Sequence, residues 1–172
     1  MSYFELFSLA PGFAIDKNAL SARFRQLQSQ YHPDNFASED DRQKAQALHK
    51  ASEVNDAYQT LLHPERRAQY LLKLAGIDIA DEQQTMHDMD FLTTQMTLRE
   101  ELEAISSQDD PEAAIDAFSA TLKSAQQQLE EIFVANYQHS QFDVAADSVR
   151  KMKFYIRLRQ QLRQLEDNLL DL

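Results

Sequence analysis

The side chains best suited to chemistry in this chain are five histidines and scattered carboxylates, since its 172 residues include no cysteine. The histidines do not show a metal-binding spacing such as His-Glu-x-x-His, and the chain lacks a serine elbow and a glycine-rich phosphate loop. Without cysteine there are no disulfides and no thiolate ligands. We therefore expect a binding protein and not an enzyme, with no catalytic residue, no metal site and no cofactor.

One histidine belongs to a tripeptide whose residue types suit recognition of a partner, His32-Pro33-Asp34. Pro33 stops the preceding helix, because a residue before proline is pushed out of the α region. Asp34 then places a carboxylate at a loop tip, where an arginine fork could pair with it. His32 can donate and accept hydrogen bonds that shape the turn. The alternative is an ordinary loop in which Asp34 only caps a local turn.

Amphipathic helices are predicted on both sides of this tripeptide. Apolar residues recur there at helical spacing, namely Leu20, Phe24, Leu27 and Tyr31, then Ala47, Ala51, Val54, Tyr58 and Leu61. This periodicity is typical of helices that bury one face. A short apolar segment, 3–9, ends at Pro11-Gly12, and a further helix runs from Pro64 to a C-cap at Gly76. Residues 1–76 therefore predict one compact helical domain.

Three longer helices are predicted in the second half, over about 88–106, 111–137 and 142–170. Two of them carry near-heptad apolar stripes, Ile115, Phe118, Leu122, Ala125, Leu129 and Ile132, then Tyr155, Leu158, Leu162, Leu165 and Leu169. Such stripes on helices joined by short loops predict an antiparallel bundle. We expect an all-α fold with a first domain over 1–76, a linker over 77–86 and a three-helix domain over 87–172.

The net charge of −11 is concentrated in one stretch, since residues 77–116 hold twelve acidic residues and one basic residue. This distribution argues against nucleic-acid binding, which needs a basic face. The acidic stretch is either a solvated face or a docking surface for a basic partner. The chain has no apolar run of the length that spans a membrane, and its start shows no export or import signal. We expect a bacterial cytoplasmic protein, with a mature mitochondrial form as the alternative.

The helix over 88–106 carries apolar residues on two faces. Its core face is predicted to hold Phe91, Leu98, Leu102 and Ile105. Leu92 and Met96 fall about 100–140° away, beside Arg99 and Glu100. Phe154, off the stripe of the last helix, is expected to join Leu92 and Met96 at the surface. Apolar residues framed by charge predict a partner site. The alternative is packing against the first domain or the second long helix.

The first 76 residues resemble the J-domain. The resemblance rests on Tyr3-Phe4-Glu5-Leu6-Phe7, Tyr31-His32-Pro33-Asp34, Asn55-Asp56-Ala57-Tyr58-Gln59-Thr60-Leu61 and Arg66-Arg67-Ala68-x-Tyr70. It implies that the loop of His32, Pro33 and Asp34 docks onto the ATPase domain of a DnaK-type chaperone and speeds ATP hydrolysis. Arg23 and Arg25 match the basic face that usually takes part, and their alternative role is solvated surface charge.

One residue departs from the J-domain pattern, which commonly has lysine after the aspartate where this chain has Asn35. The departure implies weaker pairing with a general chaperone or adaptation to a dedicated one.

Over nearly its whole length the chain resembles the HscB family of J-proteins, because it has neither a Gly/Phe-rich linker nor a cysteine-rich zinc domain. The resemblance rests on the runs Ala68-Gln69-Tyr70-Leu71-Leu72, Phe91 to Leu102, and Ala145 to Phe154. It implies that Leu92, Met96, Glu100 and Phe154 bind the iron–sulfur scaffold IscU. The chain would then deliver IscU to the chaperone HscA and stimulate its ATPase.

Relatives can carry bulkier or charged residues at the positions of Thr93, Thr97 and Ala104 in the scaffold-binding helix.

This chain has no thiolates, so any iron–sulfur cluster would be held by the partner protein. The alternatives are a J-domain adaptor for a different client and a helical interaction protein whose J-like motif is inert.

Overall fold

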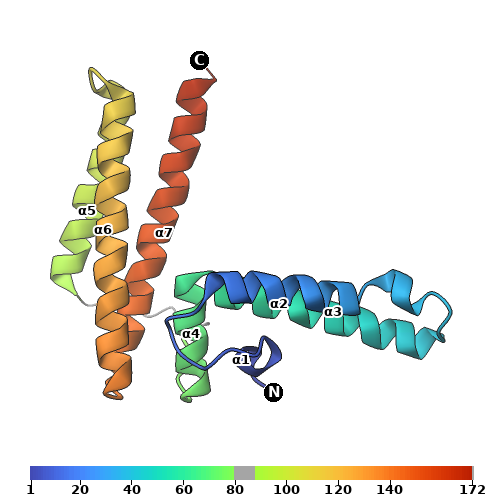
Figure 1. Cartoon of the computed structure of the whole chain (residues 1–172). Helices are drawn as coiled ribbons and strands as arrows, with labels where there is room; N and C mark the ends of the chain where they lie inside the picture. The colour runs from blue at the N-terminus through green and yellow to red at the C-terminus, as the bar shows by residue number, and fades with distance from the viewer. Residues whose placement is uncertain (80–87, 172) are drawn as a thin grey trace. The chain divides into compact units, whose positions relative to one another are not determined.

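The computed structural model describes residues 1–79 and 88–171, and every regular element in these residues is a helix (Figure 1). The chain divides into two compact units, Met1–Asp78 and Ile79–Leu172. The helices of the first unit are α1 (Tyr3–Leu6), α2 (Lys17–Gln30), the 3-10 turn η1 (Pro33–Phe36), α3 (Asp41–Leu62) and α4 (Pro64–Leu74). Those of the second are α5 (Met89–Ala104), the 3-10 turn η2 (Ile105–Ser107), α6 (Pro111–Gln138) and α7 (Phe142–Leu170).

The all-α prediction is confirmed. Most of the predicted linker over 77–86 lies outside the described residues. In the part of the chain that the structure describes, no helix combines the length and apolarity needed to cross a membrane.

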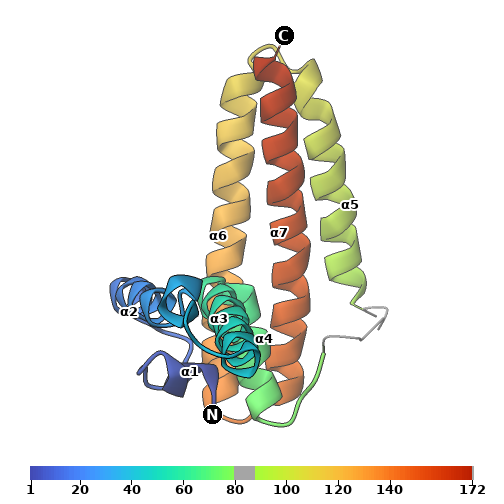
Figure 2. The same cartoon turned by 90° about the vertical axis from the view of Figure 1, so that its right-hand side faces the viewer.

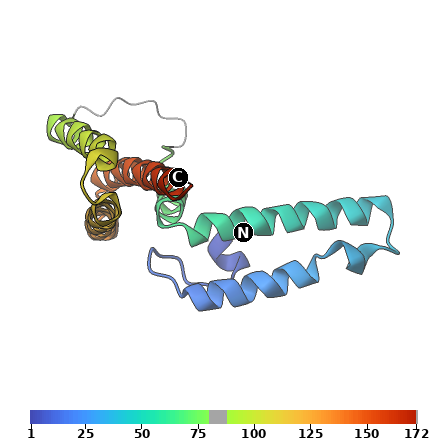
Figure 3. The ribbon, with the colours of Figure 1, turned by 90° about the horizontal axis from the view of Figure 1, so that it is seen from above.

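The first unit is built on an antiparallel pair, α2 and α3, which lie side by side (Figure 3). Asp16 caps α2 by accepting hydrogen bonds from the backbone N–H groups of Asn18 and Ala19. Asp40 and Gln43 form a reciprocal capping box at the start of α3. The core between the helices contains Phe4, Phe7, Leu20, Leu27, Val54, Leu61, Leu71 and Leu72. Each such side chain contributes about 1.5–3 kcal/mol by its removal from water.

The opening helix α1 ends earlier than Pro11-Gly12, where the apolar segment was predicted to end. Ser8 adopts φ 56°, a left-handed conformation that a helix cannot continue through. The single turn is held by Tyr70 of α4, whose hydroxyl accepts the backbone N–H of Tyr3 at 2.9 Å. The two tyrosine rings also stack with centroids 4.6 Å apart. Tertiary contacts therefore hold a helix that is too short to be stable alone.

The C-cap of α4 is Ala75, and the predicted cap residue, Gly76, follows it in the next position. Gly76 has φ 90°, a region that favours glycine, and the N–H of Ile77 donates to the carbonyl of Leu72 at 2.8 Å. Near the start of the same helix, the guanidinium of Arg67 is buried. Its Nη1 donates to the carbonyl of Leu61 at 2.6 Å, and the group lies 4.6 Å from the ring centroid of Phe13. Arg67 thus satisfies a carbonyl at the end of α3.

The second unit is an up-down-up bundle of α5, α6 and α7, as predicted (Figure 2). The stripe predicted on α6 is correct at Ile115, Phe118, Leu122 and Leu129, but Gln126 and Phe133 take the buried places predicted for Ala125 and Ile132. Gln126 and Phe133 are buried, whereas Ala125 is only partly buried and Ile132 is 43% exposed. An α-helix has 3.6 residues per turn, so a strict heptad drifts by about 20° per repeat. The buried residues of α6 therefore recur with the 3.6-residue period of the helix and not with the 3.5-residue period of a heptad.

Candidate functional site

The His32-Pro33-Asp34 tripeptide forms the first turn of η1. Pro33 occupies the first helical position, and His32 is the N-cap. The backbone N–H of Asp34 donates to His32 Nδ1 at 3.2 Å, and the N–H of Asn35 donates to the carbonyl of His32 at 3.0 Å. Since Nδ1 accepts this hydrogen bond, the proton of the neutral ring lies on Nε2 and is available to a partner.

The Asp34 side chain is 90% exposed, and its Oδ2 lies 3.5 Å from His32 Nδ1. The loop geometry therefore presents an acceptor at its tip, as predicted, and the local turn is capped by His32 and not by Asp34. The simple capping alternative for Asp34 does not describe this turn.

Asn35 ties the loop to the end of α2. Its Nδ2 donates to the carbonyl of Ser29 at 2.6 Å and lies 3.5 Å from the carbonyl of Gln30. The last carbonyls of a helix have no partner within the helix, so this side chain satisfies groups that would otherwise face water. Sequence reasoning treated Asn35 only as a departure from lysine and missed this cap. Asn35 lies five residues beyond Gln30, the last residue of α2, so the pattern of an asparagine directly after a helix did not indicate it.

A cleft of about 690 Å³ lies beside the loop, between α2 and α3. Arg25, His32, Asp34 and Asn35 line it together with residues of α3. Arg23 is not among its lining residues, because positions two apart on a helix point about 200° apart. Arg23 is half-buried, and its Nε donates to the carbonyl of Leu6 at 3.4 Å. The structure therefore brings only one of the two predicted arginines to the loop.

The predicted partner stripe on α5 is at the surface. Met96 is 64% exposed, Leu92 is partly exposed and Glu100 is exposed, at successive i,i+4 positions. Phe91, Leu98 and Ile105 are buried as predicted, whereas Leu102 is only partly buried. Met89, which sequence reasoning missed, is 72% exposed and lies seven residues before Met96, on the same face. We call Met89, Leu92, Met96 and Glu100 the α5 stripe.

Phe154 does not belong to this surface, and the expectation that it lies beside Leu92 and Met96 is wrong. Its side chain is 1% exposed. The ring meets Phe91 of α5 edge to face, with centroids 5.5 Å apart, and the guanidinium of Arg99 lies 5.6 Å from its centroid. Phe154 is a core residue that supports α5 from α7, because its position on α7 faces α5.

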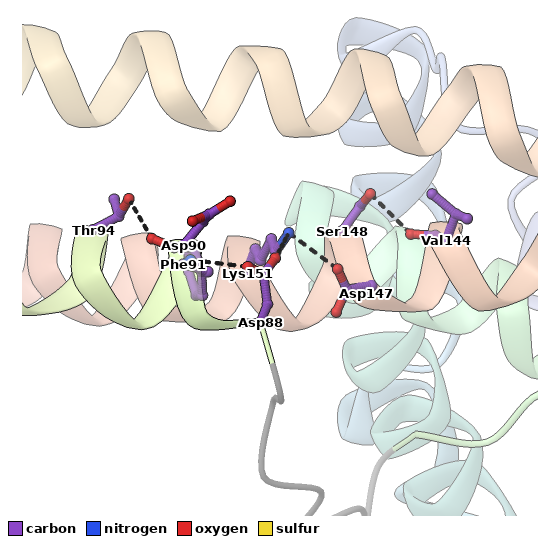
Figure 4. Close-up of polar contacts among 8 residues, drawn as sticks. All are labelled: Asp88, Asp90, Phe91, Thr94, Val144, Asp147, Ser148 and Lys151. Atoms are coloured by element: carbon purple, nitrogen blue, oxygen red, sulfur yellow. Dashed lines mark hydrogen bonds and ion pairs between the residues drawn. The ribbon is translucent and has the colours of Figure 1, made fainter.

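A polar cluster fixes the start of α5 to α7 (Figure 4). Lys151 Nζ lies 3.0 Å from Asp88 Oδ2 and 3.1 Å from Asp147 Oδ2. The other oxygen of Asp88 accepts the backbone N–H of Phe91 at 3.0 Å and so caps α5. The ammonium also lies 5.3 Å from the centroid of the Phe91 ring. We call Lys151, Asp88 and Asp147 the Lys151 cluster.

The charges in this cluster shift one another's titration. The hydrogen bond from the Phe91 backbone, with that from Lys151, lowers the pKa of Asp88 below its ordinary value. Partial burial acts to lower the pKa of Lys151, but the hydrogen bonds to Asp88 and Asp147 outweigh it and raise the pKa. Both groups therefore stay charged at neutral pH. Sequence reasoning did not single out this cluster, although an aspartate before an apolar helix was a capping signal.

Within residues 1–79 and 88–171, no group of three or more histidine, aspartate or glutamate side chains is arranged to hold a metal ion. His87 lies outside the described residues.

Each of the two units matches a known protein family. The family described as DnaJ domain matches residues 2–70, and the family described as HSCB C-terminal oligomerisation domain matches residues 87–163. Co-chaperone protein HscB of Proteus mirabilis (strain HI4320) is 46% identical over 171 residues, which is 99% of each chain. The co-chaperone protein HscB homolog of Vibrio cholerae serotype O1 (strain M66-2) is 45% identical over 170 residues, again 99% of each chain.

Solved structures agree with these matches. The chaperone HscB from Vibrio cholerae aligns with a TM-score of 0.89 at 43% identity, covering 98% of this chain and 99% of that one. The human co-chaperone protein HscB aligns with a TM-score of 0.87 at 29% identity, covering 96% and 82%. The chain described above therefore belongs to the HscB family of J-domain co-chaperones.

Proposed function

We propose that this co-chaperone binds an IscU-type iron–sulfur scaffold through its second unit and delivers it to an HscA-type chaperone of the DnaK family. Its first unit stimulates that chaperone's ATPase during cluster assembly and transfer. The observation that carries the proposal is that one chain presents both an exposed His32-Pro33-Asp34 turn and an exposed apolar stripe framed by acidic residues. The relatives named above are co-chaperones, several of them bacterial, and we place this protein in the bacterial cytoplasm.

On the chaperone side, the exposed Asp34 carboxylate is the chemical anchor. An arginine of the chaperone can pair with both of its oxygens, because a guanidinium presents parallel N–H groups. Arg25, which lines the same cleft, offers the opposite charge for an acidic group beside that arginine. His32 shapes the turn through Nδ1 and leaves its Nε2–H to the partner. Arg23 contributes through its hold on Leu6 and not from within the cleft.

On the scaffold side, the α5 stripe supplies apolar contact area framed by negative charge. Met96 and Leu92 are the expected anchors, since large side chains at the centre of an interface carry most of its binding energy. Glu100 selects a scaffold surface with a basic group nearby. Phe154 supports the stripe indirectly through Phe91, so its contribution is to the shape of α5 and not to direct contact.

The first experiment separates the two sides. The isosteric Asp34→Asn variant should lose at least about tenfold in the stimulation of HscA ATPase, because the charge-assisted pair to an arginine is removed. Its affinity for IscU should not change. Glu5→Gln, which neutralises an exposed carboxylate of α1, is the matched control and should behave as wild type. Equal stimulation by Asp34→Asn and wild type would contradict the role given to the loop.

The second experiment addresses the stripe. The Leu92→Ala, Met96→Ala double variant should bind IscU about thirty- to several hundredfold more weakly by calorimetry, since each truncation removes about 1–2 kcal/mol of apolar contact. Leu170→Ala, an exposed leucine at the end of α7, is the control. Because both replaced side chains are at the surface, the variant should keep the helical circular dichroism of the wild type. Unchanged affinity would move the scaffold site elsewhere and favour a different client.

A further inference from the structure

The helix that carries the proposed scaffold site is the least buried helix of its bundle. Of the sixteen residues of α5, only Phe91 and Leu98 are buried, whereas α6 and α7 each bury six or more. An amphipathic helix takes most of its stability in a protein from its packed face. The placement of α5 therefore depends on few side chains, and each of them matters more than a comparable residue on α6 or α7.

The Lys151 cluster is the polar attachment at the first turn of this helix. Asp88 uses both carboxylate oxygens, one to cap α5 through the N–H of Phe91 at 3.0 Å and one to bind Lys151 of α7 at 3.0 Å. A single side chain thus both starts the helix and joins it to its neighbour. Phe91, the first buried residue of α5, lies under the ammonium and against Phe154, so the apolar and polar attachments coincide.

An ion pair within α7 holds the Lys151 side chain in position for this attachment. Asp147 and Lys151 are an i,i+4 pair on the same helix, with 3.1 Å between their charged atoms. This pair holds the ammonium near the place where Asp88 binds it, so less side-chain freedom is lost when α5 packs. Lys151 is also mostly shielded from solvent, unlike the partners of an ordinary surface ion pair, whose contribution water and salt reduce.

We propose that Lys151 is a positioning residue for scaffold binding: with Asp88 and Asp147 it holds the first turn of α5 against α7 and so sets the placement of the α5 stripe. This inference rests on the scaffold-binding function proposed above. The effect is greatest at the start of the stripe. Met89 and Leu92 lie in or beside the attached turn, whereas Glu100 lies two turns further along.

The test uses the full-length chain and two readouts, hydrogen exchange of α5 amides in the free protein and affinity for IscU by calorimetry. In Lys151→Met, which keeps the stem and removes the charge, the amides of the first two turns of α5 should exchange about fivefold faster. The affinity for IscU should fall by a similar factor. Lys151→Arg, which can still bind both carboxylates, should restore both values. Lys123→Met, at an exposed lysine of α6, is the control and should change neither.

Two results would overturn this positioning role. Unchanged exchange in Lys151→Met would show that the cluster does not hold α5. Faster exchange with unchanged IscU affinity would show that the attached turn does not matter for the scaffold. Failure of the proposed function is recognised separately, because the wild-type chain itself would then not bind IscU, whatever the variants do.

Discussion

The cap that Asn35 places on α2 gives a sharp prediction for the chaperone-docking loop. Asn35 directly follows the tripeptide. Its Nδ2 donates hydrogen bonds to the carbonyls of Ser29 and Gln30, and these bonds join the loop to the end of α2. In Asn35→Ala the carbonyls of Ser29 and Gln30 return to water, and the turn that presents Asp34 loses this restraint. The loop should then spend part of its time in other conformations.

The magnitude follows from the geometry. The bond from Asn35 to Ser29 is short, at 2.6 Å, but its groups are exposed and can bond to water instead. Such a hydrogen bond contributes about 0.5–1.5 kcal/mol net. Apparent affinity scales with the fraction of chains in the competent conformation, so a loss of about 1 kcal/mol raises the concentration for half-maximal stimulation by at most about fivefold. The free energy of global unfolding should fall by no more than about 1 kcal/mol, the contribution of the lost hydrogen bond.

The assay is steady-state HscA ATPase, titrated with wild type and three variants. Asn35→Ala and the isosteric Asn35→Asp, which accepts but cannot donate, should need more protein for half-maximal stimulation and reach the same maximum. Asn35→Asp should be the weaker of the two, because its carboxylate faces the carbonyls. Asn35→Lys retains a donor and should stay close to wild type. An unchanged half-maximal concentration for Asn35→Ala would show that the Asn35 side chain does not hold the loop for docking, and a lower maximum would place the role of Asn35 after docking.

Three further predictions concern the bundle. Phe154→Ala should destabilise the second unit by about 3–5 kcal/mol, as expected for a buried phenylalanine, and a urea-unfolding change below 1 kcal/mol would contradict its core position. Gln126 is buried and its Oε1 has no hydrogen-bond partner among the described residues. Gln126→Leu should therefore raise stability by about 1 kcal/mol, and a loss would indicate a polar partner. The folded-state pKa of Asp88 is depressed, so its stabilisation is present above the ordinary aspartate value of 3.8 and is lost as pH falls through the lowered pKa. Asp88→Asn should be less stable than wild type at pH 7, and this difference should shrink toward pH 3; a constant difference would show that the charge is not responsible.

Local rules account for what could be predicted of the fold. The ends of α6 and α7 lie within one residue of the predicted ends, because a proline or a capping side chain acts within a few residues of itself. The loop of His32, Pro33 and Asp34 was predictable for the same reason. Two positions of the α6 stripe, Ala125 and Ile132, were predicted one residue too early, because an apolar pattern read as a heptad does not include the drift of a real helix.

The binding surfaces needed more than local rules. Met96 and Leu92 were placed at the surface correctly, because the face of a helix follows from its periodicity. Phe154 was predicted wrongly to lie at the surface. Its position lies off the apolar stripe of α7, but α5 packs on that side and buries it. The periodicity of α7 alone does not show where α5 packs.

Periodicity, capping and proline act over a few residues, so the sequence alone predicts an all-helical chain with a His32-Pro33-Asp34 turn between two amphipathic helices. The packing of the helices, in contrast, sets which side chains act together. It placed Arg25 at the loop and Arg23 away from it, and it joined Asp88 to Lys151 across 63 positions of sequence. Such pairings depend on how helices pack, which is set by the summed burial of many side chains and not by the residues that finally meet.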